Sequence, residues 1–144
     1  MKKELIAPCG LNCRVCKAIC SSSELKCSGC NSREGYKYKH CMECGIVKCE
    51  KRAQLIDIYC DTCPDYPCEE VLEKQTRYTS AYPMYESPMG NLQILRTRGM
   101  DALLEREEKY WTCPECSGKI SVHDGVCEKC GNKYKKTPVP AKDV

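Results

Sequence analysis

Residues 113–130 read Cys113-Pro-Glu-Cys116-Ser-Gly-Lys-Ile-Ser-Val-His-Asp-Gly-Val-Cys127-Glu-Lys-Cys130. Two Cys-x-x-Cys pairs stand here on either side of a ten-residue insert, and the two-residue gap lets both thiolates of a tight turn bind one ion. The insert alternates polar and apolar residues around Asp124-Gly125, a dipeptide typical of hairpin turns. The stretch therefore predicts a zinc ribbon over residues 111–134, with Cys113, Cys116, Cys127 and Cys130 as ligands. A rubredoxin-like iron site would need a much longer insert.

Twelve further cysteines lie upstream of this segment, which gives sixteen in 144 residues. The first eight residues are basic but contain no apolar stretch of signal-peptide length, and no run is long enough to span a membrane. We therefore expect a cytoplasmic protein without membrane association. Thiols stay reduced in the cytoplasm, so clustered cysteines there indicate metal ligands rather than disulfides.

The aliphatic content points in the same direction. Leu, Ile and Val account for 23 of 144 residues and Phe is absent, which is little for an ordinary hydrophobic core. Metal binding can supply the missing folding free energy. The sequence therefore predicts a small metal-stabilised α+β fold, with a Cys-rich zinc-knuckle domain of short helices, a helical connector and a C-terminal zinc ribbon.

The distribution of cysteines divides the chain into segments. We expect a metal-binding domain over residues 1–77, a helical connector over 78–110, the ribbon over 111–134 and a disordered tail over 135–144. Helical patterns cover residues 50–59 and 69–78. Ser87-Pro88 predicts the start of another helix that Gly99 ends, and a further helix is expected from Asp101 to about Tyr110.

Three four-thiolate sites would use all twelve N-terminal cysteines and, with the ribbon, would give four zinc ions per chain, or three if only two sites form in the N-terminal half. Spacing favours a first quartet of two Cys-x-x-Cys turns and a second quartet that spans an internal repeat, with four thiols left over. His40 precedes Cys41 and could substitute as a ligand, but we favour a structural or surface role for it, and we interpret His123 as a solvated residue at the hairpin tip. The quartets are Cys13, Cys16, Cys27 and Cys30, then Cys44, Cys49, Cys60 and Cys63, and the remaining thiols are Cys9, Cys20, Cys41 and Cys68.

Iron chemistry is the alternative use of these cysteines. The spacing Cys9-x3-Cys13-x2-Cys16 matches the cluster motif of radical S-adenosylmethionine enzymes. Those enzymes need a large α/β barrel, which this chain has neither the length nor the periodicity to form. An iron–sulfur cluster of another kind stays open, since Cys-rich runs with irregular gaps also bind such clusters.

The N-terminal half resembles a known family. The segments Ala7-Pro-Cys-Gly-Leu-Asn-Cys-Arg-Val-Cys16, Cys27-Ser-Gly-Cys30 and Cys60-Asp-Thr-Cys63-Pro-Asp-Tyr-Pro-Cys68 follow, in this order, the pattern of the bacterial and archaeal domain of unknown function 3795. The resemblance covers residues 5–75, and the C-terminal ribbon looks like one that some members carry. It implies metal binding and does not imply a reaction.

Function is constrained mainly by what the sequence lacks. It contains two His, no phosphate-binding Gly loop and no nucleophile elbow, so we favour a non-catalytic module that binds another protein. The loop 64–67 and the tyrosine-rich segment 78–85 are the expected partner surfaces. Nucleic-acid binding is the alternative, through Tyr134 and its lysine neighbours. The formal charge of +3 would fall to between −3 and −5 with three to four zinc sites of four thiolates, because each carries −2. The lysines in question are Lys129, Lys133, Lys135 and Lys136.

Overall fold

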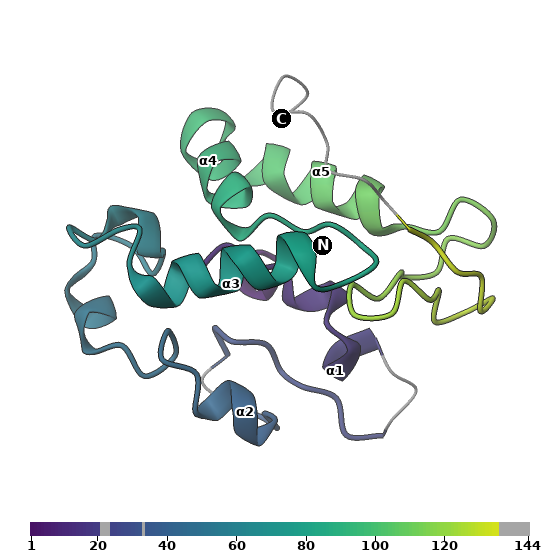
Figure 1. Cartoon of the computed structure of the whole chain (residues 1–144), viewed down its shortest axis with the longest axis horizontal. Coiled ribbons are helices and arrows are strands. Elements are labelled where there is room, and N and C mark those ends of the chain that lie inside the picture. Colours follow the sequence, from purple (N-terminus) through teal and green to yellow (C-terminus); the bar gives the residue numbers. More distant parts are fainter. Residues whose placement is uncertain (21–23, 33, 136–144) are drawn as a thin grey trace.

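The computed structural model describes residues 1–20, 24–32 and 34–135, and Figure 1 shows the course of the chain. Three helices supply most of the regular structure: α3 (Glu69–Ser80), α4 (Pro88–Arg98) and α5 (Met100–Trp111). Short helical turns occur in the Cys-rich part before α3. They are η1 (Lys3–Leu5), η2 (Cys13–Val15), α1 (Lys17–Cys20), α2 (Lys39–Met42), η3 (Glu50–Gln54) and η4 (Cys60–Thr62).

In the view of Figure 1, α3 crosses the middle of the molecule, with α4 and α5 on one side and α2 on the other. Across the residues that the structure describes, β-structure consists of isolated antiparallel bridges. The prediction of several short helices is thus confirmed, whereas the β part of the fold is smaller than expected. The bridges pair Ile6 with Asn12, Thr112 with Lys119, Ile120 with Cys127, and Val126 with Lys133.

The capping signals placed α4 and α5 correctly. Ser87 is the N-cap of α4, where its side chain accepts a 3.0 Å hydrogen bond from the N–H of Gly90, and Pro88 occupies the first turn. Gly99 ends α4 at a φ of +88°, and α5 begins at the next residue. Helix α3 follows the prediction for residues 69–78 and continues for two more residues to Ser80.

The helix predicted over residues 50–59 is wrong beyond Gln54. Only η3 (Glu50–Gln54) forms there, and the chain then bends through 55–58. Two interactions explain the change. The side chain of Asp57 accepts the backbone N–H of Tyr59 at 3.0 Å, and the N–H of Cys60 donates to the carbonyl oxygen of Pro8 at 2.9 Å. Such side-chain bonds compete with the helical pattern, and the long-range bond draws Cys60 toward the N-terminal loop.

The core joins segments that are distant in the sequence. One cluster contains Val15 from η2, Val71 from α3, Trp111 from α5 and Val122 from the ribbon segment, together with Met84 from the connector. A second cluster contains residues from the N-terminus, the segment before η4 and both later helices, namely Ile6, Tyr59, Leu92, Ile94 and Leu103. The expected domain boundaries stay a prediction, but the side chains of the three segments pack together. Apart from Lys135, the expected disordered tail lies outside the described residues.

Gly10 brings the first cysteine loop against α4. It has a φ of +90°, and a Cβ there would come within 2.1 Å of the carbonyl oxygen of Pro88 and 2.8 Å of Cγ of Leu92. The side chain of Asn91 donates a 2.9 Å hydrogen bond to the carbonyl oxygen of Gly10. Only glycine satisfies both the backbone angle and the close approach. The loop that carries Cys9 and Cys13 is therefore seated on the start of α4.

A buried polar network lies beneath this contact. Glu86 and Glu107 are both inaccessible to solvent, and both accept from the indole N–H of Trp111, at 3.2 and 3.0 Å. The side chain of Asn12 donates to Glu107 at 2.9 Å, and that of Asn91 donates to Glu86 at 2.6 Å. The network links the Cys-rich loop to α4 and α5. Within the described residues, no helix has the length and apolar character to cross a membrane.

Candidate metal centres

Four thiols of the C-terminal segment converge. The Sγ atoms of Cys113, Cys116, Cys127 and Cys130 all lie within 4.8 Å of one another. Cys113 and Cys130 have Sγ atoms 3.7 Å apart, and those of Cys116 and Cys127 are 3.5 Å apart. Tetrahedral Zn–S bonds of about 2.3 Å separate the sulfurs by about 3.8 Å. The four thiols therefore fit a tetrahedral metal ion, and this set is the one predicted from the spacing.

The backbone around the four thiols repeats one turn twice. The N–H of Ser117 donates to the carbonyl oxygen of Cys113 at 2.9 Å, and the N–H of Gly131 donates to that of Cys127 at 3.0 Å. Ser117 and Gly131 both have positive φ, at 59° and 74°. The left-handed residue after each Cys-x-x-Cys folds the chain back, so both thiols of the pair face the same side. For Ser117 this conformation costs about 1–2 kcal/mol, which indicates that the surrounding turn enforces it.

Two residues besides the cysteines, Gly118 and Tyr134, also belong to this site, and the cysteine spacing does not predict them. A Cβ on Gly118 would come within 2.7 Å of Sγ of Cys127 and 3.2 Å of Sγ of Cys116, so only glycine fits beside the thiols. The hydroxyl of Tyr134 lies 2.9 Å from Sγ of Cys113. The signal for Gly118 is its place two residues after a Cys-x-x-Cys pair, whereas Tyr134 is predicted from the sequence only as a nucleic-acid contact.

The surroundings of Cys113 favour its thiolate. Burial raises its pKa, but hydrogen bonds from the Tyr134 hydroxyl and the backbone N–H groups of Cys116 and Glu115 lower the pKa to about 6. The same contact raises the pKa of Tyr134 to about 12, so its hydroxyl keeps its proton and donates to the sulfur. A thiolate is the form that binds metal. With four protein ligands, the site has no open position for substrate, which is the property of a structural site.

Eleven of the twelve N-terminal cysteines line two cavities. The small cavity, of about 50 Å³, is surrounded by Cys49, Cys60, Cys63 and Cys68. The N-terminal thiol pocket, of about 110 Å³, also contains both histidines at its edge. Its thiols are those of Cys9, Cys13, Cys16, Cys27, Cys30, Cys41 and Cys44, and its histidines are His40 and His123.

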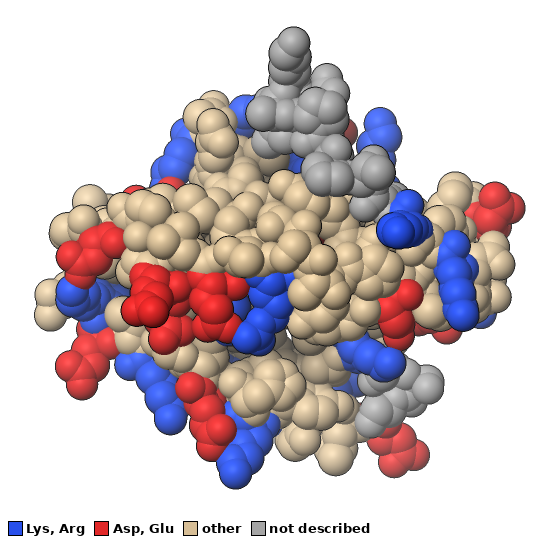
Figure 2. Space-filling view, viewed as in Figure 1, with Lys and Arg blue, Asp and Glu red and all other residues tan. Residues whose placement is uncertain are grey.

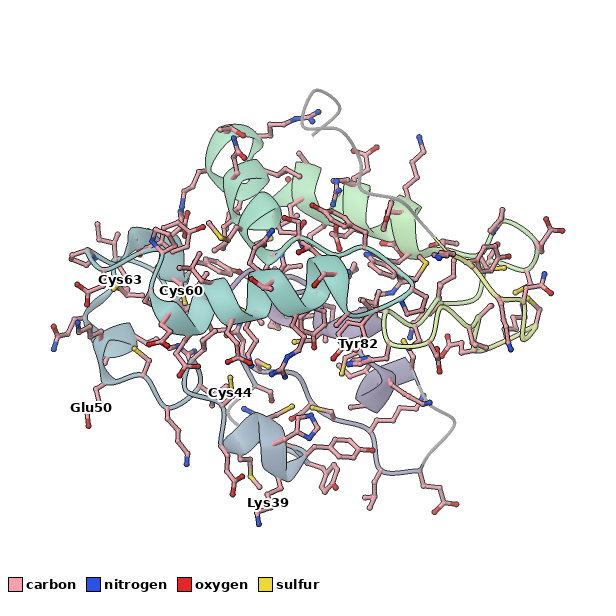
Figure 3. All side chains as sticks on the ribbon, in the orientation of Figure 1. Lys39, Cys44, Glu50, Cys60, Cys63 and Tyr82 are labelled. Carbon is pink, nitrogen blue, oxygen red and sulfur yellow. The ribbon has the colours of Figure 1, made fainter. Side chains whose placement is uncertain are left out.

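The cavities bring together the first expected quartet but divide the second. Cys13, Cys16, Cys27 and Cys30 all line the N-terminal thiol pocket. Cys44 also lines this pocket, whereas its expected partners Cys60 and Cys63 line the small cavity. Figure 3 shows Cys60 and Cys63 together near the start of α3 and Cys44 nearer to α2. Among the described thiols, only the ribbon set meets within 4.8 Å, so the N-terminal ligand sets stay a prediction.

Cys20 lies apart from both cavities. It is buried at the end of α1, and its Sγ lies 2.9 Å from the carbonyl oxygen of Arg14, to which the thiol donates. His123 is also engaged elsewhere. Its Nδ1 accepts the backbone N–H of Lys17 at 3.3 Å, and its ring packs edge-on against Tyr82 at 4.7 Å between centroids. His123 thus attaches the ribbon turn to the rest of the molecule, rather than lying free in solvent.

No protein-family model, no curated protein and no solved structure matches the chain. All sixteen cysteines are free thiols, so none is held in a disulfide. The candidate sites are therefore interpreted from their own geometry, which establishes one cluster of four cysteines able to hold a metal ion.

Proposed function

We propose that this chain is a zinc-binding, non-catalytic scaffold that binds another protein. The observation that carries the proposal is the closed set of four thiols at Cys113, Cys116, Cys127 and Cys130, which leaves a tetrahedral ion no open position. The motif order in residues 5–75 supports a further proposal, that the N-terminal half belongs to the domain of unknown function 3795 family. The resemblance to that family also implies that the N-terminal half binds metal.

The lining of a concavity beside α4 supports a non-catalytic role. Its volume is about 690 Å³, and it is lined by Arg96, Arg106, Tyr66 and Tyr85 among others, with no cysteine or histidine. A nucleophile paired with a base is the usual signature of covalent catalysis, and this surface offers none. The cysteines are directed instead toward metal-sized spaces.

Zinc is the expected metal. Protein purified under reducing conditions without added metal is expected to be colourless and to contain zinc without acid-labile sulfide, as measured by elemental analysis. Cys116→Ser should lose one ion per chain because it breaks the ribbon set, and the neighbouring Thr112→Ser should lose none. A brown protein that contains iron and sulfide would instead support the iron–sulfur alternative.

The surface proposed for the partner is not the tyrosine-rich segment. Tyr78 and Met84 are buried in the core, and Tyr82 packs on His123, so these side chains are engaged within the molecule. Ile56 is 98% exposed on the bend after η3, and Ile58 is exposed beside it. A fully exposed isoleucine costs solvation free energy that contact with an apolar partner surface would recover.

A stable protein partner is expected to depend on this bend. In a pull-down with the metal-loaded protein, Ile56→Asp with Ile58→Asp should lose a partner that the wild type retains. Gln54→Asp, which adds a charge at a nearby exposed polar position, should retain it. The identified partner should then bind the purified wild type directly and bind the double variant at least tenfold more weakly.

Nucleic acid is the outcome that would overturn this proposal. Lys129, Lys133 and Lys135 are exposed on the ribbon, whereas Lys136 lies outside the described residues. The hydroxyl of Tyr134 is engaged with Cys113, and Figure 2 shows both charge signs interspersed over the visible face. We expect no tight binding of RNA or DNA at physiological salt. Nanomolar binding that weakens steeply with salt and is abolished by Lys133→Glu with Lys135→Glu would establish the alternative.

A further inference from the structure

The four thiols of the small cavity come from three turns of the chain. Cys49 directly precedes η3, Cys68 directly precedes α3, and Cys60 and Cys63 flank the turn of η4. The N–H of Cys63 donates to the carbonyl oxygen of Cys60 at 3.0 Å, which folds this pair toward one side. The space of about 50 Å³ between the thiols suits a single ion. Zinc would draw the sulfurs to about 3.8 Å, so binding is expected to contract the cavity.

Positively charged groups lie around the small cavity. Arg52 lines it and donates to the carbonyl oxygens of Ile46 and Val47, at 3.4 and 3.2 Å, while its buried Nε has no partner among the described residues. The N-terminus of α3, a twelve-residue helix, begins next to Cys68 and adds partial positive charge. Glu70 and Lys51 also line the cavity, and Lys51 is ion-paired with Asp65. A Zn²⁺ ion with four thiolates carries −2, part of which Arg52 and the end of α3 can balance.

The N-terminal thiol pocket contains too many thiols for one ion. Two of its Cys-x-x-Cys pairs form the same folded turn. The N–H of Cys16 donates to the carbonyl oxygen of Cys13 at 3.1 Å, and the N–H of Cys44 donates to the carbonyl oxygen of Cys41 at 3.3 Å. Seven thiols fill one four-coordinate ion and leave three ligands for a second, so an eighth ligand is needed. Positive charge is available there as well. Lys37 donates to the carbonyl oxygen of Cys30, and Lys74 and Arg77 of α3 line the pocket.

His40 is the better placed of the two histidines. It lies on α2 next to Cys41, so one short turn presents both side chains to the pocket. Within the described part of the chain, its ring nitrogens form no hydrogen bond, and its ring only packs on Tyr38 at 5.9 Å. By contrast, Nδ1 of His123 already accepts an N–H and its ring is packed on Tyr82 and Tyr78. A neutral imidazole with a free nitrogen is a common zinc ligand.

We propose that the N-terminal half binds three metal ions, with ligand sets that differ from those predicted by spacing. One ion is bound by Cys49, Cys60, Cys63 and Cys68. Two ions share the seven thiols of the N-terminal thiol pocket, with His40 as the eighth ligand. Cys20 binds none, because its thiol donates to the carbonyl oxygen of Arg14. The inference rests on the proposed zinc function and extends it from the ribbon to the whole chain, for a total of four ions.

Native mass spectrometry of the reduced, metal-loaded protein tests the count. Four zinc ions per chain are expected, with four retained in Cys20→Ser. Cys49→Ser and Cys68→Ser should each lose one ion, and the double variant should lose the same single ion. Cys44→Ser combined with Cys49→Ser should lose at least two, because these thiols serve different ions. If this combination loses one ion and Cys49→Ser with Cys68→Ser loses two, the proposed grouping is wrong.

A measurement on the wild type avoids variants that fail to fold. Limiting amounts of a chelator remove ions stepwise, and alkylation with peptide mapping then shows which thiols are released together. Cys49, Cys60, Cys63 and Cys68 should become modified in concert, and Cys44 should be released with the pocket thiols. Release of Cys44 with Cys60 and Cys63, while Cys68 reacts separately, would overturn the assignment.

The histidine assignment has its own control. His40→Ala should reduce the count from four to three, His40→Cys should restore four, and His123→Ala should retain four. A His40→Ala protein with four ions, or a His123→Ala protein with three, would show that His40 is not the eighth ligand. One ion at the ribbon alone, or iron and sulfide in the pocket, would refute this inference while leaving a metal-bound ribbon. Zinc at neither place would refute the proposed function too.

Discussion

Removal of all metal at neutral pH is expected to abolish cooperative unfolding of the protein. Structural zinc contributes about 10–16 kcal/mol in small zinc domains, whereas the whole net stability of a typical domain is about 5–15 kcal/mol. The Cys-rich part offers little to replace that contribution. Its helical turns span three to five residues each, far below the length at which an isolated helix is stable.

The later helices are not expected to stay native on their own. The cluster around Leu92, Ile94 and Leu103 is completed by Ile6 and Tyr59, which belong to the Cys-rich part. Trp111, the only tryptophan, is buried in the same core cluster as Cys113 and Cys127 of the ribbon. Loss of metal at either end should therefore expose Trp111 and weaken the packing of α4 against α5.

The fluorescence of Trp111 provides the measurement. Treatment with a strong chelator in the presence of reductant should shift its emission to longer wavelength and remove the sigmoidal thermal transition, and added zinc should restore both. A reduced sample without chelator controls for thiol chemistry alone. A metal-free protein that keeps a buried tryptophan and a cooperative transition would show that the apolar core suffices, despite its small aliphatic content.

Local signals predicted the later helices and the convergence of the four C-terminal thiols because each depends on residues that are close in the sequence. Ser87 and Gly99 define α4 through its own caps, and the ribbon thiols lie within 18 residues of one another. The bend after Gln54 could not be predicted in this way. It depends on a hydrogen bond from Cys60 to Pro8, more than 50 residues away, and a helical pattern in 50–59 carries no trace of that contact.

The grouping of the N-terminal cysteines also depends on contacts that spacing in the sequence does not show. Spacing predicted Cys44 and Cys49 in one quartet because only four residues lie between them. In the structure Ile46 lines both cavities, and the two thiols line different ones. The burial of Glu86 could not be predicted from the sequence either, because a charged residue directly before a helix cap is usually exposed. Only the packing of Asn12, Asn91 and Trp111 around it reveals that it is buried.

Glu86 is expected to make stability depend on pH in the direction opposite to an ordinary surface carboxylate. Burial raises its pKa well above the usual value of 4.5, and the nearby Glu107 raises it further. Arg106 donates to Glu107 and favours its charged form, so Glu86 is the member of the pair that keeps a proton. A raised pKa in the folded state gives stability that is complete below the unfolded pKa and is lost as pH rises through the folded pKa.

Glu86→Gln isolates this effect, because a glutamine cannot lose the proton and can still donate to Glu107. The free energy of unfolding of the variant minus that of the wild type should increase from pH 6 to pH 9. The slope should reach up to about 1.4 kcal/mol per pH unit until the folded pKa of Glu86 is passed. Urea unfolding followed by circular dichroism measures the difference, and the titration of thiols cancels because both proteins share it.

Glu105→Gln on the exposed side of α5 is the matched control, and its difference from the wild type should stay flat over the same range. A flat difference for Glu86→Gln would mean that Glu86 is ionised in the folded protein. In that case two buried carboxylates would face one indole N–H, and Arg106 would be the one cation among the described residues that donates to the pair. The desolvation cost of that arrangement is more than the small core could offset. A slope confined to Glu86→Gln instead shows that Glu86 keeps its proton in the folded protein, within the network that links the Cys-rich loop to α4 and α5.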